Sequence, residues 1–297
     1  MIGILGAGSL GRLWAASMPP GSAAFIARPD ESPGSDLGYR FRPFNGPESI
    51  ARVPWLRAYD RPELILVTTK AGDTLDAVAG LVDRCSGDTP IILFQNGLGS
   101  QQAVADQWQD RPILAASTTE GANRPEPDLL VHAGTGDTWV GPLTEPARRS
   151  VEKAVALLRR TGLAIHPEPD ILQRLWQKLI INAGINPYTA ILDCPNGDIL
   201  AACLYQDTID DLCRELSALI AAAGQGEETP AALRGRIERV ARNTAKNTSS
   251  MRADILHGRR TEIDFINGYL VRLGKELGIE TPVNQMLTER VQQLSSH

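Results

Sequence analysis

The chain has 297 residues, of which 42% are hydrophobic and 22% are charged, and its formal net charge is −5. This length suits two globular domains, and the acidic balance argues against a general nucleic-acid binder. No apolar run reaches the roughly 18 residues that a membrane span needs. We therefore expect neither a nucleic-acid nor a membrane partner.

The cysteines and histidines do not form a recognisable ligand set. The four cysteines contain no C-x-x-C spacing, and the four histidines are scattered along the chain. We therefore expect neither a metal site nor a disulfide framework. An apolar segment begins at the first residue and leaves no room for a targeting leader, so a cytoplasmic location is expected.

The first half of the chain alternates short apolar runs with stretches of helical period, which is typical of a parallel sheet covered by helices. Strands are predicted at residues 1–5, 23–27, 64–68, 91–94 and 113–116. Helices are predicted at residues 10–18, 74–82, 101–107 and 145–161. A β-hairpin is predicted from residues 129–133 and 138–141 around a glycine-rich turn. The proline-rich stretch 29–62 is interpreted as an irregular loop with one weak strand.

The pattern changes after residue 166. Pro167 and Pro169 mark the change, and beyond them nearly every segment has helical period while strand signals disappear. The sequence therefore predicts an α/β domain over residues 1–166, followed by an all-α domain over residues 167–297.

A glycine-rich motif of the form G-x-G-x-x-G lies between the first predicted strand and the first predicted helix. Its first glycine permits a tight turn, its second lets the backbone approach a pyrophosphate, and its third allows close packing of helix on strand. The helix N-terminus adds free N–H groups and a positive dipole end. We predict a Rossmann-type domain whose dinucleotide contacts are Gly6, Ala7, Gly8, Ser9, Leu10 and Gly11. A glycine-rich turn without a ligand is the alternative.

Three further polar residues follow predicted strands. Arg28 ends the second strand, where a guanidinium would accept the 2′-phosphate of NADPH. A solvated Arg28 with Asp30 on the ribose would instead suit NADH. Lys70 and Asn96 follow later strands at their carboxyl ends, where open α/β sheets bind ligands. Taken alone, they would equally fit a loop lysine and an Asn-Gly turn.

A row of polar residues lies on an otherwise apolar helical segment of the second half. Lys178, Asn182 and Asn186 are spaced i, i+4 and i+8, so they share one helix face. Buried lysine and asparagine cost free energy unless they find partners, and the row therefore predicts a polar cleft. A solvated stripe on an amphipathic helix is the alternative.

Two other polar segments occur in this half. Glu262 precedes a helix with an apolar face, and it is either a site residue or a first-turn acid following the N-cap Thr261. The cluster at residues 247–251 is either part of a site or a helix break.

In this order along the chain, the segments resemble the ketopantoate reductase (2-dehydropantoate 2-reductase) family. The resemblance is carried by residues 6–11, 66–70, 95–99, 175–187, 193–197, 247–251 and 260–268. It implies a Rossmann domain at residues 1–166 that binds NADPH and a helical substrate domain at residues 167–297. It also implies an active site in the cleft between the two domains.

The resemblance also implies roles for individual residues. Lys178 would be the general acid, and Glu262 would order both the lysine and the substrate. The 2-oxo acid would be held by Asn96, Asn182, Asn186, Asn196, Asn247 and Ser250. Lys70 and Asn96 would lie on the cofactor side, and Arg28 would select NADPH.

The activity implied is NADPH-dependent reduction of 2-dehydropantoate to pantoate, a step towards pantothenate and coenzyme A. A dehydrogenase of 3-hydroxy acids or glycerol 3-phosphate usually has a longer helical domain than residues 167–297 provide. A family member that acts on another 2-oxo acid remains open. A non-catalytic NADP-binding sensor also remains open, although it would have no use for Lys178 with Glu262. A monomer or a homodimer is expected.

Overall fold

The computed structural model describes residues 1–28, 34–57 and 60–295. It divides into two units, one made of Met1–Gln95 with Ser100–Arg174, the other of Asn96–Gly99 with Leu175–His297. The boundary had been expected near residue 167, but the first eight residues after it belong to the first unit. The short segment Asn96–Gly99 joins the second unit because its backbone bonds there, with Leu98 N donating to Phe265 O at 2.8 Å. Asp30 lies outside the described residues.

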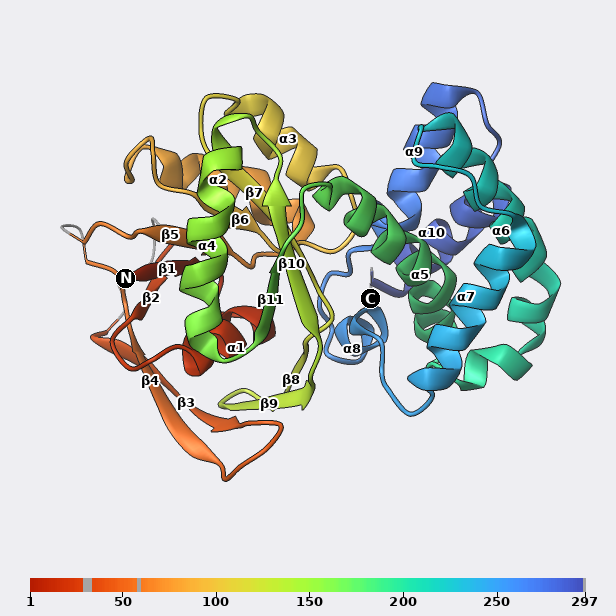
Figure 1. The fold of residues 1–297 in the computed structure, drawn as a ribbon. Helices are drawn as coiled ribbons and strands as arrows, with labels where there is room; N and C mark the ends of the chain where they lie inside the picture. The colour runs from red at the N-terminus through yellow and green to blue at the C-terminus, as the bar shows by residue number, and fades with distance from the viewer. Residues whose placement is uncertain (29–33, 58–59, 296–297) are drawn as a thin grey trace. The chain divides into compact units, whose positions relative to one another are not determined.

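The first unit is built on a seven-stranded sheet with the order β11-β10-β7-β6-β5-β1-β2 (Figure 1). The strands are β1 (Ile2–Leu5), β2 (Ala23–Ile26), β5 (Leu64–Val67), β6 (Ile91–Leu93), β7 (Ile113–Thr118), β10 (Asp137–Pro142) and β11 (Ala164–Pro167). Neighbouring strands are parallel except that β10 runs antiparallel to β7. The five strands predicted from the apolar runs are confirmed.

Alternate residues of the central strands belong to two separate apolar clusters, as expected for a sheet that is covered on both faces. One cluster takes in α1 (Ser9–Ser17) and α4 (Val151–Leu158), and the other takes in α2 (Thr74–Val82) and α3 (Ser100–Gln107). The four predicted helices are therefore confirmed. The last of them begins as the 3-10 turn η2 (Pro146–Ser150) and ends as η3 (Arg159–Thr161).

The predicted hairpin between residues 129–133 and 138–141 is wrong. Both segments are strands, but they enter different sheets: β10 pairs with β7 and β11, whereas β9 (Leu129–Gly134) pairs with β8 (Gly121–Glu126) and with β3 (Asp36–Arg42). The glycine-rich turn therefore carries the chain from one sheet to the other. Its sequence specifies a reversal of direction, but it does not specify which strand becomes the partner.

The stretch 29–62 also holds more structure than an irregular loop with one strand. It contributes β3 and β4 (Ser49–Pro54), which form an antiparallel pair in a second sheet with the order β4-β3-β9-β8. Tyr39, Phe41 and Val53 are buried in the cluster that contains α1. Because α1 contacts strands of both sheets, this second sheet supports the helix that follows the glycine-rich loop.

The second unit is helical, and residues 168–295 contain no strand (Figure 1). Its helices are α5 (Ile171–Ile191), α6 (Cys203–Ala222), α7 (Pro230–Asn243), α8 (Ser250–Leu256), α9 (Asn267–Leu277) and α10 (Pro282–Ser295), with 3-10 turns η4 (Asp198–Ala201) and η5 (Ile263–Phe265). Helix α6 contacts α7, α9 and α10, and its buried face includes Leu212, Leu216 and Leu219.

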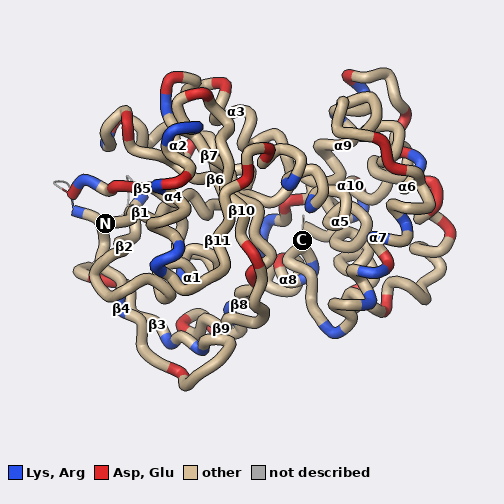
Figure 2. Tube along the Cα trace, viewed as in Figure 1, with Lys and Arg blue, Asp and Glu red and all other residues tan. Residues whose placement is uncertain are grey.

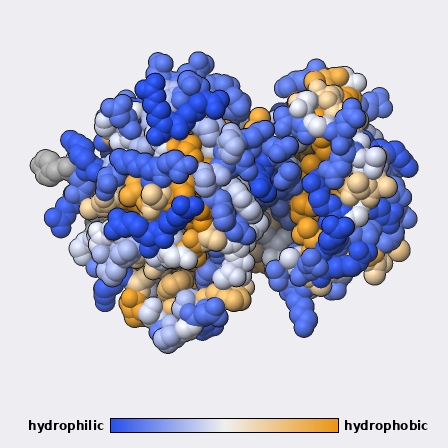
Figure 3. All heavy atoms as spheres, in the orientation of Figure 1, coloured by the Kyte–Doolittle hydropathy of each residue, from blue (hydrophilic) through white to orange (hydrophobic). Residues whose placement is uncertain are grey.

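Charge and hydropathy are distributed over both units. Acidic and basic residues are interspersed along both (Figure 2), and hydrophilic residues dominate the face shown in Figure 3. Among the described residues, no helix has both the length and the apolar character required to cross a bilayer.

Candidate active site

The glycine-rich loop of the first unit is tightly packed at two of its glycines and open at the third. A Cβ on Gly11 would lie 2.0 Å from the carbonyl oxygen of Gly6, and a Cβ on Gly6 would lie 2.9 Å from the backbone of Thr68. Gly6 also has a φ of +106°, which only glycine adopts readily. Around Gly8, by contrast, no described atom lies within 4 Å of where a Cβ would stand. The loop therefore leaves its backbone accessible at Gly8.

Side chains of the first unit hold this loop in place. Thr68 Oγ1 donates to Gly6 O at 2.7 Å, and Arg12 Nε donates to Ala7 O at 3.0 Å. Arg12 also donates to Pro127 O at 3.0 Å, and its own carbonyl accepts the hydroxyl of Tyr39. Helix α1 has Gly8 as its N-cap, with no side-chain capping bond. The first-turn N–H groups are therefore available to an anionic ligand.

The two basic residues predicted near the cofactor follow strands next to β1. Arg28 comes two residues after β2 and is exposed, and Lys70 comes three residues after β5 and is half-buried. Since β2, β1 and β5 are parallel neighbours, their carboxyl ends meet at the edge that carries the glycine-rich loop. This edge has the basic side chains and free N–H groups that suit phosphates.

Asn96 lies with the residues of the helical unit. Its Nδ2 donates to Glu262 Oε2 at 3.1 Å. The next residue, Gly97, has a φ of +80°, and a Cβ there would lie 2.0 Å from Phe265 O. The Asn-Gly pair therefore forms the turn that its sequence suggests, and that turn presents the amide of Asn96 to a buried carboxylate.

Lys178 and Glu262 interact electrostatically within the helical unit. Burial lowers the pKa of Lys178 to about 8, while the nearby negative charge of Glu262 acts to raise it. Glu262 is itself only 8% exposed. A lysine with a pKa near neutrality can both hold and release a proton under ordinary conditions, which is what a general acid requires.

The other two members of the polar row lie further along α5. Asn186 is buried and Asn182 is half-buried. In the described part of the chain, neither side-chain amide has a hydrogen-bond partner recorded, although the backbone carbonyl of Asn186 accepts from Thr189. Among the described residues, neither amide is one of the buried polar groups that lack a hydrogen-bond partner, so both stay accessible and are suited to bind a polar ligand.

Three more predicted site residues lie around the loop that precedes α8. Asn196 donates through Nδ2 to Thr244 Oγ1 at 2.9 Å, and its backbone N–H donates to Asn247 O at 3.0 Å. Asn196 therefore braces this loop. Asn247 and Ser250 are exposed, and Ser250 is the first residue of α8, which Ser249 caps.

Thr68 and Arg12 were not among the predicted site residues. Thr68 lies within a segment that carries the family resemblance. It also ends the predicted strand 64–68, and this position could have indicated a contact with the glycine-rich loop. The signal for Arg12 is a cation on the buried face of an amphipathic helix, since residues 11–15 are all buried.

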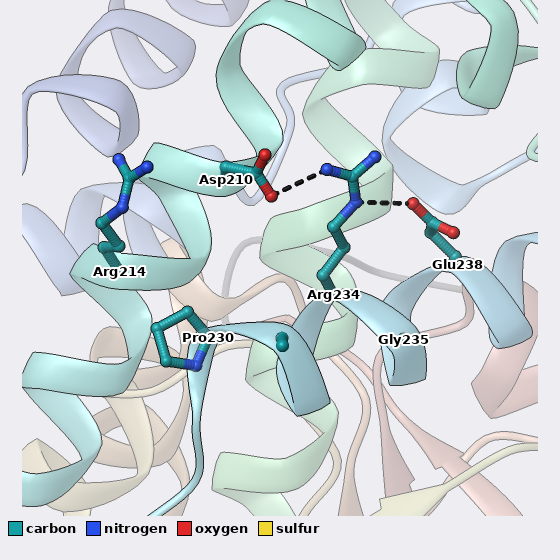
Figure 4. Close-up of a pocket in the computed structure, with 7 residues that line it drawn as sticks. Asp210, Arg214, Pro230, Arg234, Gly235 and Glu238 are labelled. Carbon is teal, nitrogen blue, oxygen red and sulfur yellow. Dashed lines mark hydrogen bonds and ion pairs between the residues drawn. The ribbon is translucent and has the colours of Figure 1, made fainter.

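A surface cavity of about 410 Å³ lies between α6 and α7, but it contains none of the predicted site residues (Figure 4). Arg234 projects into it and is held by Asp210 at 2.7 Å and by Glu238 at 2.8 Å. The second arginine of the lining, Arg214, is paired with Asp211. With both cations already paired to carboxylates, this cavity offers little to a charged ligand.

Two domain families match the chain and together cover most of it. Residues 2–145 match "Ketopantoate reductase PanE/ApbA", and residues 170–295 match "Ketopantoate reductase PanE/ApbA C terminal". The chain belongs to the ketopantoate reductase family. As a member of the ketopantoate reductase family, the protein is an oxidoreductase, and the resemblance seen in the sequence is confirmed.

Curated relatives agree with this assignment, and a solved structure shares the fold. The 2-dehydropantoate 2-reductase of Vibrio cholerae is 36% identical over 233 residues, which are 78% of this chain and 77% of the relative. That of Archaeoglobus fulgidus is 32% identical over 295 residues, which are 99% and 97% of the two chains. A solved D-mandelate dehydrogenase with NADH and anilino(oxo)acetate has a similar fold, with a TM-score of 0.85, 22% identity and coverage of 100% of this chain and 98% of that chain.

The packing of the glycine-rich loop generates a first prediction. Gly11→Ala places a methyl group against Gly6 O, so the loop must shift. We expect the free energy of unfolding to fall by about 1–3 kcal/mol and dinucleotide binding to weaken at least tenfold, measured by thermal melting and fluorescence titration.

The control is Gly87→Ala, at an exposed glycine whose Cβ would meet no described atom within 4 Å. It should change neither measurement. Unaltered dinucleotide affinity in Gly11→Ala would show that the close approach of Gly11 to Gly6 is unimportant for the ligand.

Proposed function

We propose that the protein reduces 2-dehydropantoate to pantoate with NADPH, and that Lys178 is the proton donor. The observation that carries this proposal is the pair formed by the half-buried Lys178 and the buried Glu262, in which desolvation brings the lysine pKa to about 8. A lysine in this state is suited to protonating the oxygen of a ketone as it becomes an alkoxide. Family membership supplies the substrate, since the relatives are named for 2-dehydropantoate.

The residues of the helical unit have distinct tasks in this reaction. A dinucleotide held by the first unit would supply the hydride for the ketone carbon. Lys178 gives a proton from Nζ to the ketone oxygen, and Glu262 stabilises the ammonium form before that transfer. Asn96 donates to Glu262 Oε2 and so fixes the orientation of the carboxylate. The amides of Asn182 and Asn186 donate to the substrate's carboxylate or hydroxyl, and Asn196, Asn247 and Ser250 complete its surroundings.

The first unit has the groups that a dinucleotide requires. The loop is open at Gly8, and the N-terminus of α1 has no side-chain cap, which suits the pyrophosphate. Arg28 would hold the 2′-phosphate of NADPH, and Lys70 lies on the same edge of the sheet. We therefore assign nucleotide binding to residues 1–166, and substrate binding and proton transfer to residues 167–297 with Asn96.

A second candidate is the reduction of another 2-oxo acid. The D-mandelate dehydrogenase that shares this fold was solved with anilino(oxo)acetate, a 2-oxo acid derivative of different shape. A non-catalytic sensor is disfavoured, because such a protein would gain nothing from burying Lys178 beside Glu262.

Substrate identity is tested by following NADPH oxidation with ketopantoate, 3-methyl-2-oxobutanoate and phenylglyoxylate. We expect kcat/KM to be highest for ketopantoate. A preference for phenylglyoxylate would favour the second candidate. NADPH binding without oxidation by any acid in the panel would favour a sensor.

Cofactor choice is tested by Arg28→Asp. Loss of a charge-assisted contact to the 2′-phosphate should weaken NADPH binding by about 1.5–3 kcal/mol, or tenfold and more, while NADH binding should not weaken. Arg149→Asp makes the same charge change at another exposed arginine of this unit and should leave both dissociation constants unchanged. Equal affinities for the two dinucleotides in the unmodified protein would refute the role of Arg28.

The role of Lys178 is tested by rate and by pH. Lys178→Ala should lower kcat by about 10²–10⁴ and leave NADPH affinity nearly intact. Because the ammonium form donates, the reduction rate should fall as the pH rises through about 8. Glu262 raises the Lys178 pKa, so Glu262→Gln should move this decline to lower pH. The exposed Lys275→Ala serves as the control and should change neither rate nor profile.

A further inference from the structure

Helix α5, which carries Lys178, contains a proline where the backbone should be continuously hydrogen-bonded. Pro187 lies inside α5 and is buried. Proline has no N–H, so the carbonyl of the residue four positions earlier loses its helical donor, and the proline ring crowds that carbonyl. The affected carbonyl belongs to Ala183, which is fully buried. A buried carbonyl at this position needs another donor.

A side chain from a distant part of the sequence supplies that donor. Asn267, the first residue of α9, is fully buried, and its Nδ2 lies 3.3 Å from Ala183 O and 3.0 Å from Asn284 Oδ1. Both neighbours are hydrogen-bond acceptors, so the amide can only present its nitrogen to them. Asn267 Oδ1 has no hydrogen-bond partner within the described chain. Packing alone would favour an apolar residue here, which indicates that the donated bonds matter.

The same network continues to a buried carboxylate. Asn284 Nδ2 donates to Glu215 Oε2 at 2.7 Å. Glu215 also accepts the backbone N–H groups of Val283 at 2.7 Å and Asn284 at 3.0 Å, which caps the first turn of α10. The position of Asn267 is therefore fixed through α10 and α6.

Asn267 stands at the end of the short segment that bears Glu262. Within that segment, Phe265 N donates to Glu262 O at 3.0 Å and Ile266 N donates to Ile263 O at 3.1 Å, which forms the 3-10 turn η5. The acceptor of the Asn267 hydrogen bond, Ala183 O, belongs to α5, five positions after Lys178. One hydrogen bond thus links the backbone of the lysine helix to the segment of its carboxylate partner.

We propose that Asn267 is a positioning residue that holds Glu262 beside Lys178 by donating to the Ala183 carbonyl that Pro187 leaves without its helical N–H. Asn267 touches neither reacting group. It acts by fixing the register between η5 and α5. The link to catalysis depends on the proposed function, whereas the effect on the Lys178–Glu262 pair does not.

The test uses Asn267→Ala, Pro187→Ala and the double variant. In Pro187→Ala the backbone regains an N–H for Ala183 O, so the bond from Asn267 to that carbonyl becomes dispensable. We expect Asn267→Ala to lower kcat at least tenfold with little change in the KM for NADPH. Pro187→Ala should stay within about threefold of the unmodified protein, and the double variant should recover most of the loss.

A second readout does not require catalysis. The pKa of Lys178 is measured by NMR on protein with reductively ¹³C-methylated lysines, with Lys178→Arg used for assignment. The charge of Glu262 acts to raise the Lys178 pKa. Asn267→Ala should therefore lower this pKa by about half a unit or more, and the double variant should restore it.

Each outcome decides the proposal. A lower melting temperature in Asn267→Ala, with kcat and the Lys178 pKa unchanged, would reduce Asn267 to a packing role and overturn it. A double variant as impaired as Asn267→Ala would overturn the link through Ala183. If Asn267→Ala does not fold, restored folding in the double variant supports the link and failure there refutes it. If the unmodified protein reduces no 2-oxo acid, the proposed function falls while the NMR comparison still decides the inference.

Discussion

The chemistry of the helical unit depends on the partial desolvation of one ammonium group, that of the half-buried Lys178. Lys178 lies on a helix whose neighbouring residues Leu175 and Leu179 are buried, and desolvation there favours its neutral form. Glu262 opposes that effect by favouring the charged form. The balance between the two determines how readily the lysine gives up its proton. It can be maintained only if the carboxylate stays at a fixed distance, because electrostatic attraction at low dielectric changes steeply with separation.

Much of the surrounding structure provides that constraint. Asn96 orients the carboxylate directly, and Gly97 lets its own backbone approach Phe265 where any side chain would collide. Asn267 then ties the same segment to the helix of the lysine. In the other unit, Thr68 and Arg12 bond to carbonyls of the glycine-rich loop, and no side chain caps the N-terminus of α1 that follows it. At the lysine pair and at the glycine-rich loop alike, polar side chains bond to backbone carbonyls. These bonds fix the backbone that positions the groups available to a ligand.

Features encoded in short stretches of sequence were predictable. The strands, the four helices of the first half, the glycine-rich loop and the polar row on α5 each depend on local period or local spacing, and the structure contains all of them. Features that depend on long-range partners were not predictable. The glycine turn at residues 134–136 gave no indication that β9 and β10 enter different sheets, and the prolines of residues 29–62 concealed β3 and β4. Asn96 follows a strand of the first half, and its hydrogen-bond partner Glu262 is 166 positions away, so local sequence could not reveal this contact.

The segment Asn96–Gly99 has a consequence for dissecting the molecule. The chain leaves the first unit after Gln95, contributes four residues to the helical unit, and returns at Ser100. Neither unit is therefore a continuous stretch of polypeptide. A gene fragment that ends near residue 167 would carry Leu98, which is 4% exposed in the intact chain, without the Phe265 carbonyl that its backbone bonds. The complementary fragment would lack the amide that orients Glu262. Two separately expressed halves could complement each other only if Asn96–Gly99 of one half bound to the helical unit of the other, in addition to each half folding.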